Sequence, residues 1–197
     1  MTDTSTAYHE AAHAVAAFNL GLPVVYLTTQ PHEDDNGRTT FDTASEGFQK
    51  LDALSCAIIK MAGECAERQL AGEVLPKFNW LSDDDDAEDA RAFAAQMDVG
   101  DEFQNRDWAT HRTRTLVRNW WPEIEVVAEK LRKSKTLVGE EVARICLAEA
   151  ARRSARSIAA TPPKPKPAKP AKKPRRPSSG DREVRPFTFQ VKKGAQS

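Results

Sequence analysis

The chain has 197 residues, which allows one ordinary domain plus an appendage, and its formal net charge is zero. The zero conceals a split: residues 161–197 hold eleven Lys/Arg and two acids, a net of +9, so the first 160 residues carry −9. No stretch approaches the ~18 apolar residues of a membrane span, and the N-terminus lacks the basic start and apolar run of a signal peptide. These features exclude an integral membrane helix and predict a soluble, cytoplasmic protein.

The first predicted element is a helix over residues 7–20. This run is rich in helix formers, and either Ser5 or Thr6 can serve as its N-cap. Gly21, followed by a proline two residues later, is expected to end it. The helix carries the pattern His-Glu-Ala-Ala-His at positions 9–13.

Two histidines of this pattern are candidate zinc ligands. Positions i and i+4 lie about 40° apart around a helix axis, so His9 and His13 project side by side and can bind one Zn²⁺. Glu10 lies about 100° away on the flank, where its carboxylate could reach a water on the metal without being a ligand. That is the layout a general base needs. Two solvated helix histidines remain the alternative interpretation.

Two short strands are predicted next, over residues 23–29 and 37–41. The first is β-branched and aromatic, and the connection between the strands carries an Asn-Gly turn signal at Asn36 and Gly37, which predicts a small hairpin. The edge of this hairpin could accept an extended peptide by main-chain pairing. Equally, the hairpin could serve only to cover the core.

The remainder of the first 160 residues is predicted to be helical. Cys56, Cys65 and Cys146 are odd in number, lack a Cys-x-x-Cys pairing and fall on apolar helix faces, so we expect reduced core residues. Gly63 lies inside the first of these helices and costs about 1 kcal/mol relative to alanine, which indicates a close helix contact. The predicted helices span 47–71, 83–97 with Ser82 as N-cap, 102–120, 122–133 and 139–157.

The last segment, residues 161–197, is predicted to be a separate disordered tail. It opens with a Pro/Lys/Ala tract, which cannot form a packed core. Its charge would suit nucleic acid or an acidic partner, although a solubilising spacer without a partner is an equal alternative.

A catalytic zinc site needs a third protein ligand besides the two histidines. The candidates are His32 in the hairpin loop, His111 on a later helix, and the four consecutive aspartates at residues 83–86. Acids at a helix N-terminus are also favoured by the helix dipole, which is the simpler interpretation of the aspartate run. Four adjacent aspartates repel one another, however, and a bound dication would relieve that repulsion.

Four stretches occur in an order that resembles a known family. They are HEAAHAVAA at 9–17, AGECAERQLAGEV at 62–74, SDDDDAEDARAFA at 82–94 and KTLVGEEVARI at 135–145. Over roughly residues 5–147 the chain resembles the peptidase domain of the FtsH-like, ATP-dependent zinc metalloproteases. The resemblance implies a mainly α-helical zinc-metallopeptidase-like domain with a small β-hairpin, covering residues 1–160.

The resemblance also implies the third ligand. In the family it is an aspartate followed four residues later by alanine, which matches Asp86 and Ala90, with Asp85 as the reserve. Two departures are Ala12, which replaces a glycine, and Glu64, which replaces an arginine. No Gly-x-x-x-x-Gly-Lys-Ser/Thr phosphate loop occurs in the sequence, so we expect a standalone domain without the nucleotide-driven module.

The resulting expectation is a zinc-dependent metalloendopeptidase that acts on peptides or unfolded segments without its own ATPase. Zn²⁺ would activate water and polarise the scissile carbonyl, and Glu10 would take the proton. A separate unfoldase partner and an oligomer are compatible with the sequence. The alternative is a zinc-stabilised, non-catalytic interaction module whose tail binds nucleic acid or an acidic partner.

Overall fold

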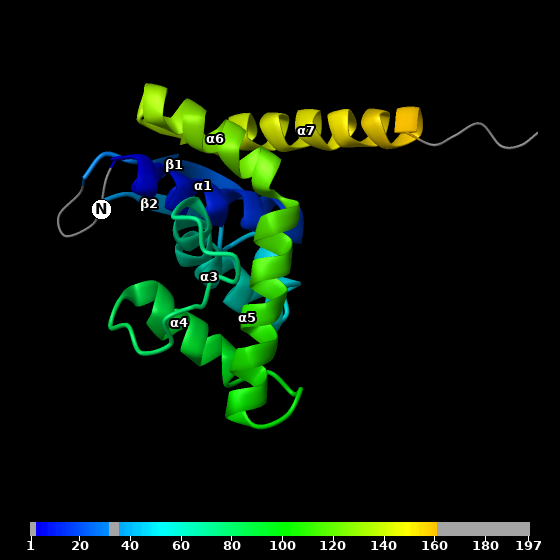
Figure 1. The fold of residues 1–197 in the computed structure, drawn as a ribbon. Coiled ribbons are helices and arrows are strands. Elements are labelled where there is room, and N and C mark those ends of the chain that lie inside the picture. Colours follow the sequence, from blue (N-terminus) through cyan, green and yellow to red (C-terminus); the bar gives the residue numbers. More distant parts are fainter. Residues whose placement is uncertain (1–2, 32–35, 161–197) are drawn as a thin grey trace, which may run out of the picture. The chain divides into compact units, whose positions relative to one another are not determined.

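The protein is mainly helical, with a small antiparallel sheet of three strands, and this confirms the predicted fold class (Figure 1). The structure, a computed structural model, describes residues 3–31 and 36–160. The predicted tail, residues 161–197, and the candidate ligand His32 lie outside the described residues. No helix in the described ranges is long and apolar enough to cross a membrane. The elements are α1 (Asp3–Leu20), β1 (Val24–Thr28), β2 (Arg38–Phe41), α2 (Glu46–Gln49), α3 (Ala53–Leu70), α4 (Asp85–Ala94), α5 (Glu102–Asn119), α6 (Trp121–Ser134), β3 (Thr136–Val138) and α7 (Gly139–Ala160).

Helix α1 is the centre of the fold. It packs against α3 on one side and α6 on the other, and it also contacts the sheet and α7 (Figure 1). Its sequence explains this position, because six of its 18 residues are alanines, which let neighbouring helices approach closely; Ala7, Ala11, Ala14 and Ala17 are fully buried. The helix already includes Ser5 and Thr6, so their predicted N-cap role is wrong.

The sheet has the strand order β2-β1-β3, with β1 in the middle. The predicted hairpin is confirmed: Leu27 of β1 lies opposite Thr39 of β2. On its other side, Leu27 lies opposite Leu137 of β3, a strand that the sequence interpretation missed. Leu27 and Leu137 are buried in the main hydrophobic core. The third strand, β3, therefore connects the C-terminal helices α6 and α7 to the β1-β2 hairpin.

The region between residues 46 and 94 differs from prediction at two helix starts. The helix predicted over 47–71 is two helices, because Asp52 caps α3 with a carboxylate that accepts a hydrogen bond from the Ser55 backbone N–H at 2.7 Å. Helix α4 is capped by Asp84, which accepts from the Ala87 N–H at 2.7 Å, and not by Ser82. The α4 helix therefore begins at the third aspartate of the run.

A second, smaller hydrophobic cluster holds α4 and α5 against α3. Ala57 and Met61 of α3 meet Ala87 and Ala90 of α4 there, together with Ala109 of α5. This packing brings the first turn of α4 over α3. The three cysteines are free and buried, as predicted.

Candidate metal centre

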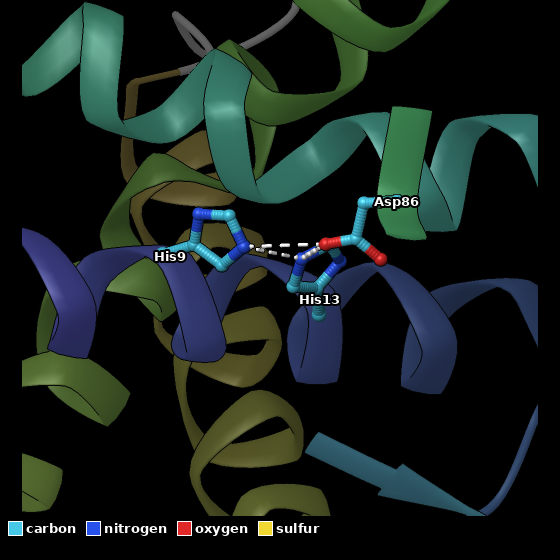
Figure 2. Close-up of side chains that lie close together, drawn as sticks. All are labelled: His9, His13 and Asp86. Carbon is cyan, nitrogen blue, oxygen red and sulfur yellow. Dashed lines mark hydrogen bonds and ion pairs between the residues drawn. The ribbon is translucent and has the colours of Figure 1, made fainter. Parts of the chain in front are cut away.

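Two side chains from α1 and one from α4 converge at a single point (Figure 2). Nε2 of His9 lies 2.9 Å from Nε2 of His13, and Oδ2 of Asp86 lies 3.3 Å from the first and 3.0 Å from the second. The two histidines meet because they are one helical turn apart. Asp86 reaches them from the first turn of a helix 77 residues further along the chain.

His13 is oriented by the backbone of α3. Its Nδ1 lies 2.6 Å from the carbonyl oxygen of Ile59, and the side chain is buried. A carbonyl oxygen can only accept a hydrogen bond, so Nδ1 must carry the proton and donate it. In the neutral imidazole Nε2 is then the atom with the free lone pair, and this atom faces His9 and Asp86.

His9 is oriented in a similar way by Glu67, a residue that the sequence interpretation did not single out. Nδ1 of His9 lies 3.4 Å from Oε2 of Glu67, within ion-pair range although without hydrogen-bond geometry. Ser5 donates a hydrogen bond to the other carboxylate oxygen of Glu67 at 2.7 Å. A carboxylate behind a histidine is the usual arrangement that orients a metal-ligating imidazole. Only the spatial contact reveals this role, because Glu67 lies on α3.

The side chains of this cluster shift one another's pKa values in favour of their charged forms. Burial alone would lower the pKa of His9, but its interactions with Asp86 and Glu67, aided by the charge of Glu10, raise this pKa to about 10. Burial would raise the pKa of Asp86, yet His13 and His9 hold it far below its usual range. A positive charge at this point is thus favourable. A metal cation would supply it in place of a proton.

The side chain of Lys60, on α3, forms an ion pair with the second carboxylate oxygen of Asp86. Its ammonium lies 3.2 Å from Oδ1 of Asp86 and 2.8 Å from Oδ2 of Asp89. Burial by itself would lower the pKa of Lys60, but the two aspartates raise it. The Lys60 contact leaves Oδ2 of Asp86 directed at the histidines, and it keeps the carboxylate ionised.

Gly63 of α3 lies directly against the two imidazoles. A Cβ atom at this position would lie 2.4 Å from Nε2 of His13 and 2.5 Å from Nε2 of His9, closer than real Cβ contacts come. The close helix contact expected at Gly63 is therefore present, and the partners of the glycine are the candidate ligand atoms. Any side chain at position 63 would fill the space in front of both nitrogens.

Glu10 lies beside the cluster and is held by the sheet. Its side chain is buried, and Oε2 accepts a hydrogen bond from the hydroxyl of Thr39 in β2 at 2.7 Å. The same hydroxyl also contacts the Glu10 carbonyl oxygen at 3.1 Å. A Cβ atom at Gly37 would lie 3.0 Å from Cγ and Oε1 of Glu10, so the backbone before β2 covers one side of the carboxylate.

The donor set fits zinc. Ligand atoms around a tetrahedral Zn²⁺ with bonds of about 2.0–2.2 Å stand roughly 3.3–3.6 Å apart. The observed separations of 2.9, 3.0 and 3.3 Å lie at the lower end of this range or a few tenths of an ångström below it. Two neutral imidazoles and one carboxylate are also ligands that zinc prefers. That these residues bind zinc remains a prediction, as does the base role of Glu10.

The other candidate ligands have different surroundings. Asp85 is exposed, and among the described residues only Asp86 of the aspartate run joins the two histidines. His111 is exposed on α5, where its ring stacks against Trp108. Glu64, noted above as a departure from the family that the sequence resembles, accepts a hydrogen bond from Arg68 at 2.7 Å and one from the backbone N–H of Asn79 at 3.0 Å. Glu64 thus fastens the loop after α3.

Comparison with known proteins yields a weak similarity to a curated protein. No protein-family model matches the chain. The chain is 27% identical over 94 residues to murein peptide amidase A of Vibrio campbellii (strain ATCC BAA-1116). The match covers 48% of this chain and 35% of the amidase, so the chain spans about a third of that protein's length.

Proposed function

We propose that this protein is a zinc-dependent metalloendopeptidase of the His-Glu-x-x-His type that cleaves peptides or unfolded segments. The proposal rests on the presence of two kinds of group at the site, a set of candidate metal ligands and a separate carboxylate. Two imidazole nitrogens and one carboxylate oxygen converge on a point, while a second carboxylate, Glu10, stays outside the cluster and bonds to Thr39. A purely structural zinc site uses four protein ligands and needs no carboxylate beside it.

The site residues would act as follows. His9, His13 and Asp86 would hold the ion, and Zn²⁺ would supply a Lewis acid for the scissile carbonyl and for the attacking water. Glu10 would take the proton from that water and later return it to the leaving amine. The hydrogen bond from Thr39 fixes the orientation of Oε2 of Glu10. Oε1 is the oxygen that this bond leaves available for proton transfer.

Strand β2 is the proposed binding surface for the substrate backbone. It is an edge strand of the sheet, since β1 pairs with it on one side only. Thr39 links β2 directly to Glu10. An extended peptide that pairs with the outer edge of β2 would therefore pass close to the proposed base. Such pairing requires an unfolded segment, which matches a peptidase that acts without unfolding its substrates.

Two further observations support the assignment. The ordered resemblance to the FtsH-like peptidase domain includes the residues that the structure brings together. The weak similarity to a protein named murein peptide amidase A is consistent with a hydrolase that cleaves amide bonds. Within these possibilities, the geometry around Glu10 favours peptide hydrolysis.

The decisive variant is Glu10→Gln, which keeps the shape of the side chain but cannot accept the proton. Hydrolysis of fluorescent peptides and of an unfolded protein should fall about 100-fold or more, while zinc content stays unchanged. Glu88→Gln, a change at an exposed glutamate of α4, is the matched control and should retain full activity. Equal rates for the wild type and Glu10→Gln would reject the peptidase and favour the non-catalytic module.

A further inference from the structure

Lys60 places a positive charge next to Asp86, a proposed ligand of a metal cation. Its ammonium lies 3.2 Å from Oδ1 of Asp86 and 2.8 Å from Oδ2 of Asp89. By charge alone, a lysine at this position would weaken the binding of a dication. A favourable effect of Lys60 on the metal site must therefore come from the way it holds the Asp86 carboxylate.

The two oxygens of Asp86 have different partners. Oδ2 makes the contacts with the Nε2 atoms of His9 and His13, at 3.3 and 3.0 Å, and these contacts meet at one carboxylate oxygen (Figure 2). Oδ1 makes the contact with Lys60. The ion pair with Lys60 thus opposes a rotation of the carboxylate that would bring both oxygens to the same ion.

Two helices hold Lys60 in place. On α3 it lies three residues before Gly63, on the side of the helix that borders the two imidazoles. On α4, Asp86 and Asp89 are also three residues apart, so their carboxylates are neighbours and Lys60 pairs with both. The exposed fraction of the Lys60 side chain is 26%, which limits its freedom to leave the two carboxylates.

The number of ligand atoms that Asp86 offers affects which metal ions suit the site. Together with His9 and His13, one oxygen of Asp86 gives three ligand atoms, and zinc in catalytic sites has three protein ligands and an open position. Mn²⁺, Mg²⁺ and Ca²⁺ prefer more ligands, most of them oxygens, and Ca²⁺ can take both oxygens of one carboxylate. A carboxylate held to one oxygen therefore favours an ion of low coordination number.

We propose that Lys60 is a positioning residue that restricts Asp86 to ligation through Oδ2, and that it thereby sets a preference of the site for Zn²⁺ over Mn²⁺. The ion pair keeps Oδ1 bound to the ammonium. Asp89 fixes the ammonium and so acts on the metal site through Lys60. The inference rests on the metal site of the proposed peptidase, but it concerns the choice of ion, and its test requires no hydrolysis.

The test compares Zn²⁺ and Mn²⁺ affinities of the full chain after bound metal has been removed. Zn²⁺ is measured by competition with a chromophoric chelator, and Mn²⁺ by the electron paramagnetic resonance of the free ion. Lys60→Met keeps an unbranched side chain but has no charge, and it should lower the ratio of the Zn²⁺ to the Mn²⁺ affinity about tenfold. Lys50→Met, at an exposed lysine paired with Glu46, is the matched control.

The ratio separates position from charge. Loss of a positive charge alone would raise the affinities for both dications alike and leave their ratio unchanged. An unchanged ratio in Lys60→Met would therefore reject the positioning role of Lys60, while the peptidase function stands. Circular dichroism of each variant in a chelator checks that the helices are retained.

A second pair of variants leaves Lys60 itself in place. Asp89→Ala and Glu88→Ala each remove one negative charge from α4, but Asp89 contacts Lys60 whereas Glu88 is exposed. Asp89→Ala should lower the Zn²⁺/Mn²⁺ ratio, by less than Lys60→Met does, and Glu88→Ala should leave it unchanged. Equal ratios in these two variants would contradict the proposal.

Cobalt provides a spectroscopic readout of the same restriction. Four-coordinate Co²⁺ absorbs visible light more strongly than six-coordinate Co²⁺. At full Co²⁺ loading the visible band of Lys60→Met should be weaker than that of the wild type, because Asp86 can then offer both oxygens. Bands of equal intensity would reject the restriction of Asp86 to one oxygen.

The role of Lys60 and the peptidase function can fail separately. The expected changes in metal preference and cobalt absorption, without any hydrolysis of peptides by the wild type, would reject the peptidase but retain the role of Lys60. A wild-type chain that binds neither Zn²⁺ nor Mn²⁺ would reject both.

Discussion

Gly63 and His13 are so close that a Cβ atom on the glycine would lie 2.4 Å from Nε2 of the histidine. Glycine inside a helix normally costs about 1 kcal/mol relative to alanine. Gly63 lies in the middle of the 18-residue helix α3, where that cost applies in full. Glycine at position 63 therefore leaves room for the two imidazoles, at the cost of a less stable α3 helix.

Gly63→Ala separates the effect of this position on helix stability from its effect on the metal site. The added methyl group should displace His9 and His13 and lower zinc affinity about 10–100-fold, measured by competition with a chromophoric chelator. Helix content by circular dichroism should be retained. An unchanged zinc affinity together with a higher melting temperature would show that only helix propensity matters at this position.

Glu67→Gln tests the orientation of His9. The variant removes the charge that faces Nδ1 while it preserves the side-chain shape, so zinc affinity should fall about tenfold. Glu64→Gln on the same helix is the matched control, because Glu64 contacts Arg68 and Asn79 and is expected to leave the affinity unchanged. Equal affinities for the wild type and Glu67→Gln would mean that Glu67 does not support the metal site.

Gly37→Ala addresses Glu10 without changing a ligand. Its methyl group would lie 3.0 Å from Oε1 of Glu10 and 2.7 Å from Cγ2 of Thr6, so the carboxylate must shift. We expect kcat/KM to fall about tenfold, since a base displaced by a few tenths of an ångström loses part of its effect. Zinc content, measured by mass spectrometry of the metal, should stay at the wild-type level. Full activity would contradict the assigned position of the base.

Asp52 provides a prediction about stability and pH. Its hydrogen bonds with Ser55, above all the side-chain contact, hold the Asp52 pKa below its ordinary value of 3.8. The carboxylate therefore contributes stability above pH 3.8, and this contribution is lost as the pH falls through the lowered pKa. Asp52→Ala should cost about 1 kcal/mol of unfolding free energy at pH 7 because the α3 cap is lost.

The Asp52 prediction is measured by urea unfolding in a chelator, so that metal loss does not contribute. The difference between the wild type and Asp52→Ala should shrink below pH 3.8. Asp52→Asn keeps a capping oxygen but lacks the charge, so its stability should lie between those of Asp52→Ala and the wild type at pH 7. A constant difference across this range would show that the Asp52 charge has no part in the cap.

Local sequence signals predicted most of the helices but not the third strand. Helices α5 and α6 begin and end within a few residues of prediction because their capping residues and apolar spacing are local. Strand β3 has three residues and exists through its pairing with β1, which lies more than a hundred residues earlier. The break before α3 was missed because apolar spacing continues across it, although Asp52 is a typical cap.

In the candidate metal site too, the features set by local sequence were predicted and those set by the tertiary fold were not. The spacing of His9 and His13 follows directly from helix geometry, whereas Asp86 required the family resemblance, because no local signal distinguishes it from Asp85. The contacts of Glu67 and Lys60 arise where α3 packs against α1 and α4. Such contacts between helices depend on the tertiary fold and leave no periodic pattern in the sequence.

We propose that His9, His13 and Asp86 hold one zinc ion, and the zinc content of variants at two adjacent positions tests this most directly. Asp86→Ala and Asp85→Ala remove the same charge from neighbouring positions of α4, but only Asp86 lies with the histidines. The wild type and Asp85→Ala should each contain one zinc per chain by plasma mass spectrometry, and Asp86→Ala should contain almost none. Full zinc in Asp86→Ala, or its loss in Asp85→Ala alone, would contradict the assignment.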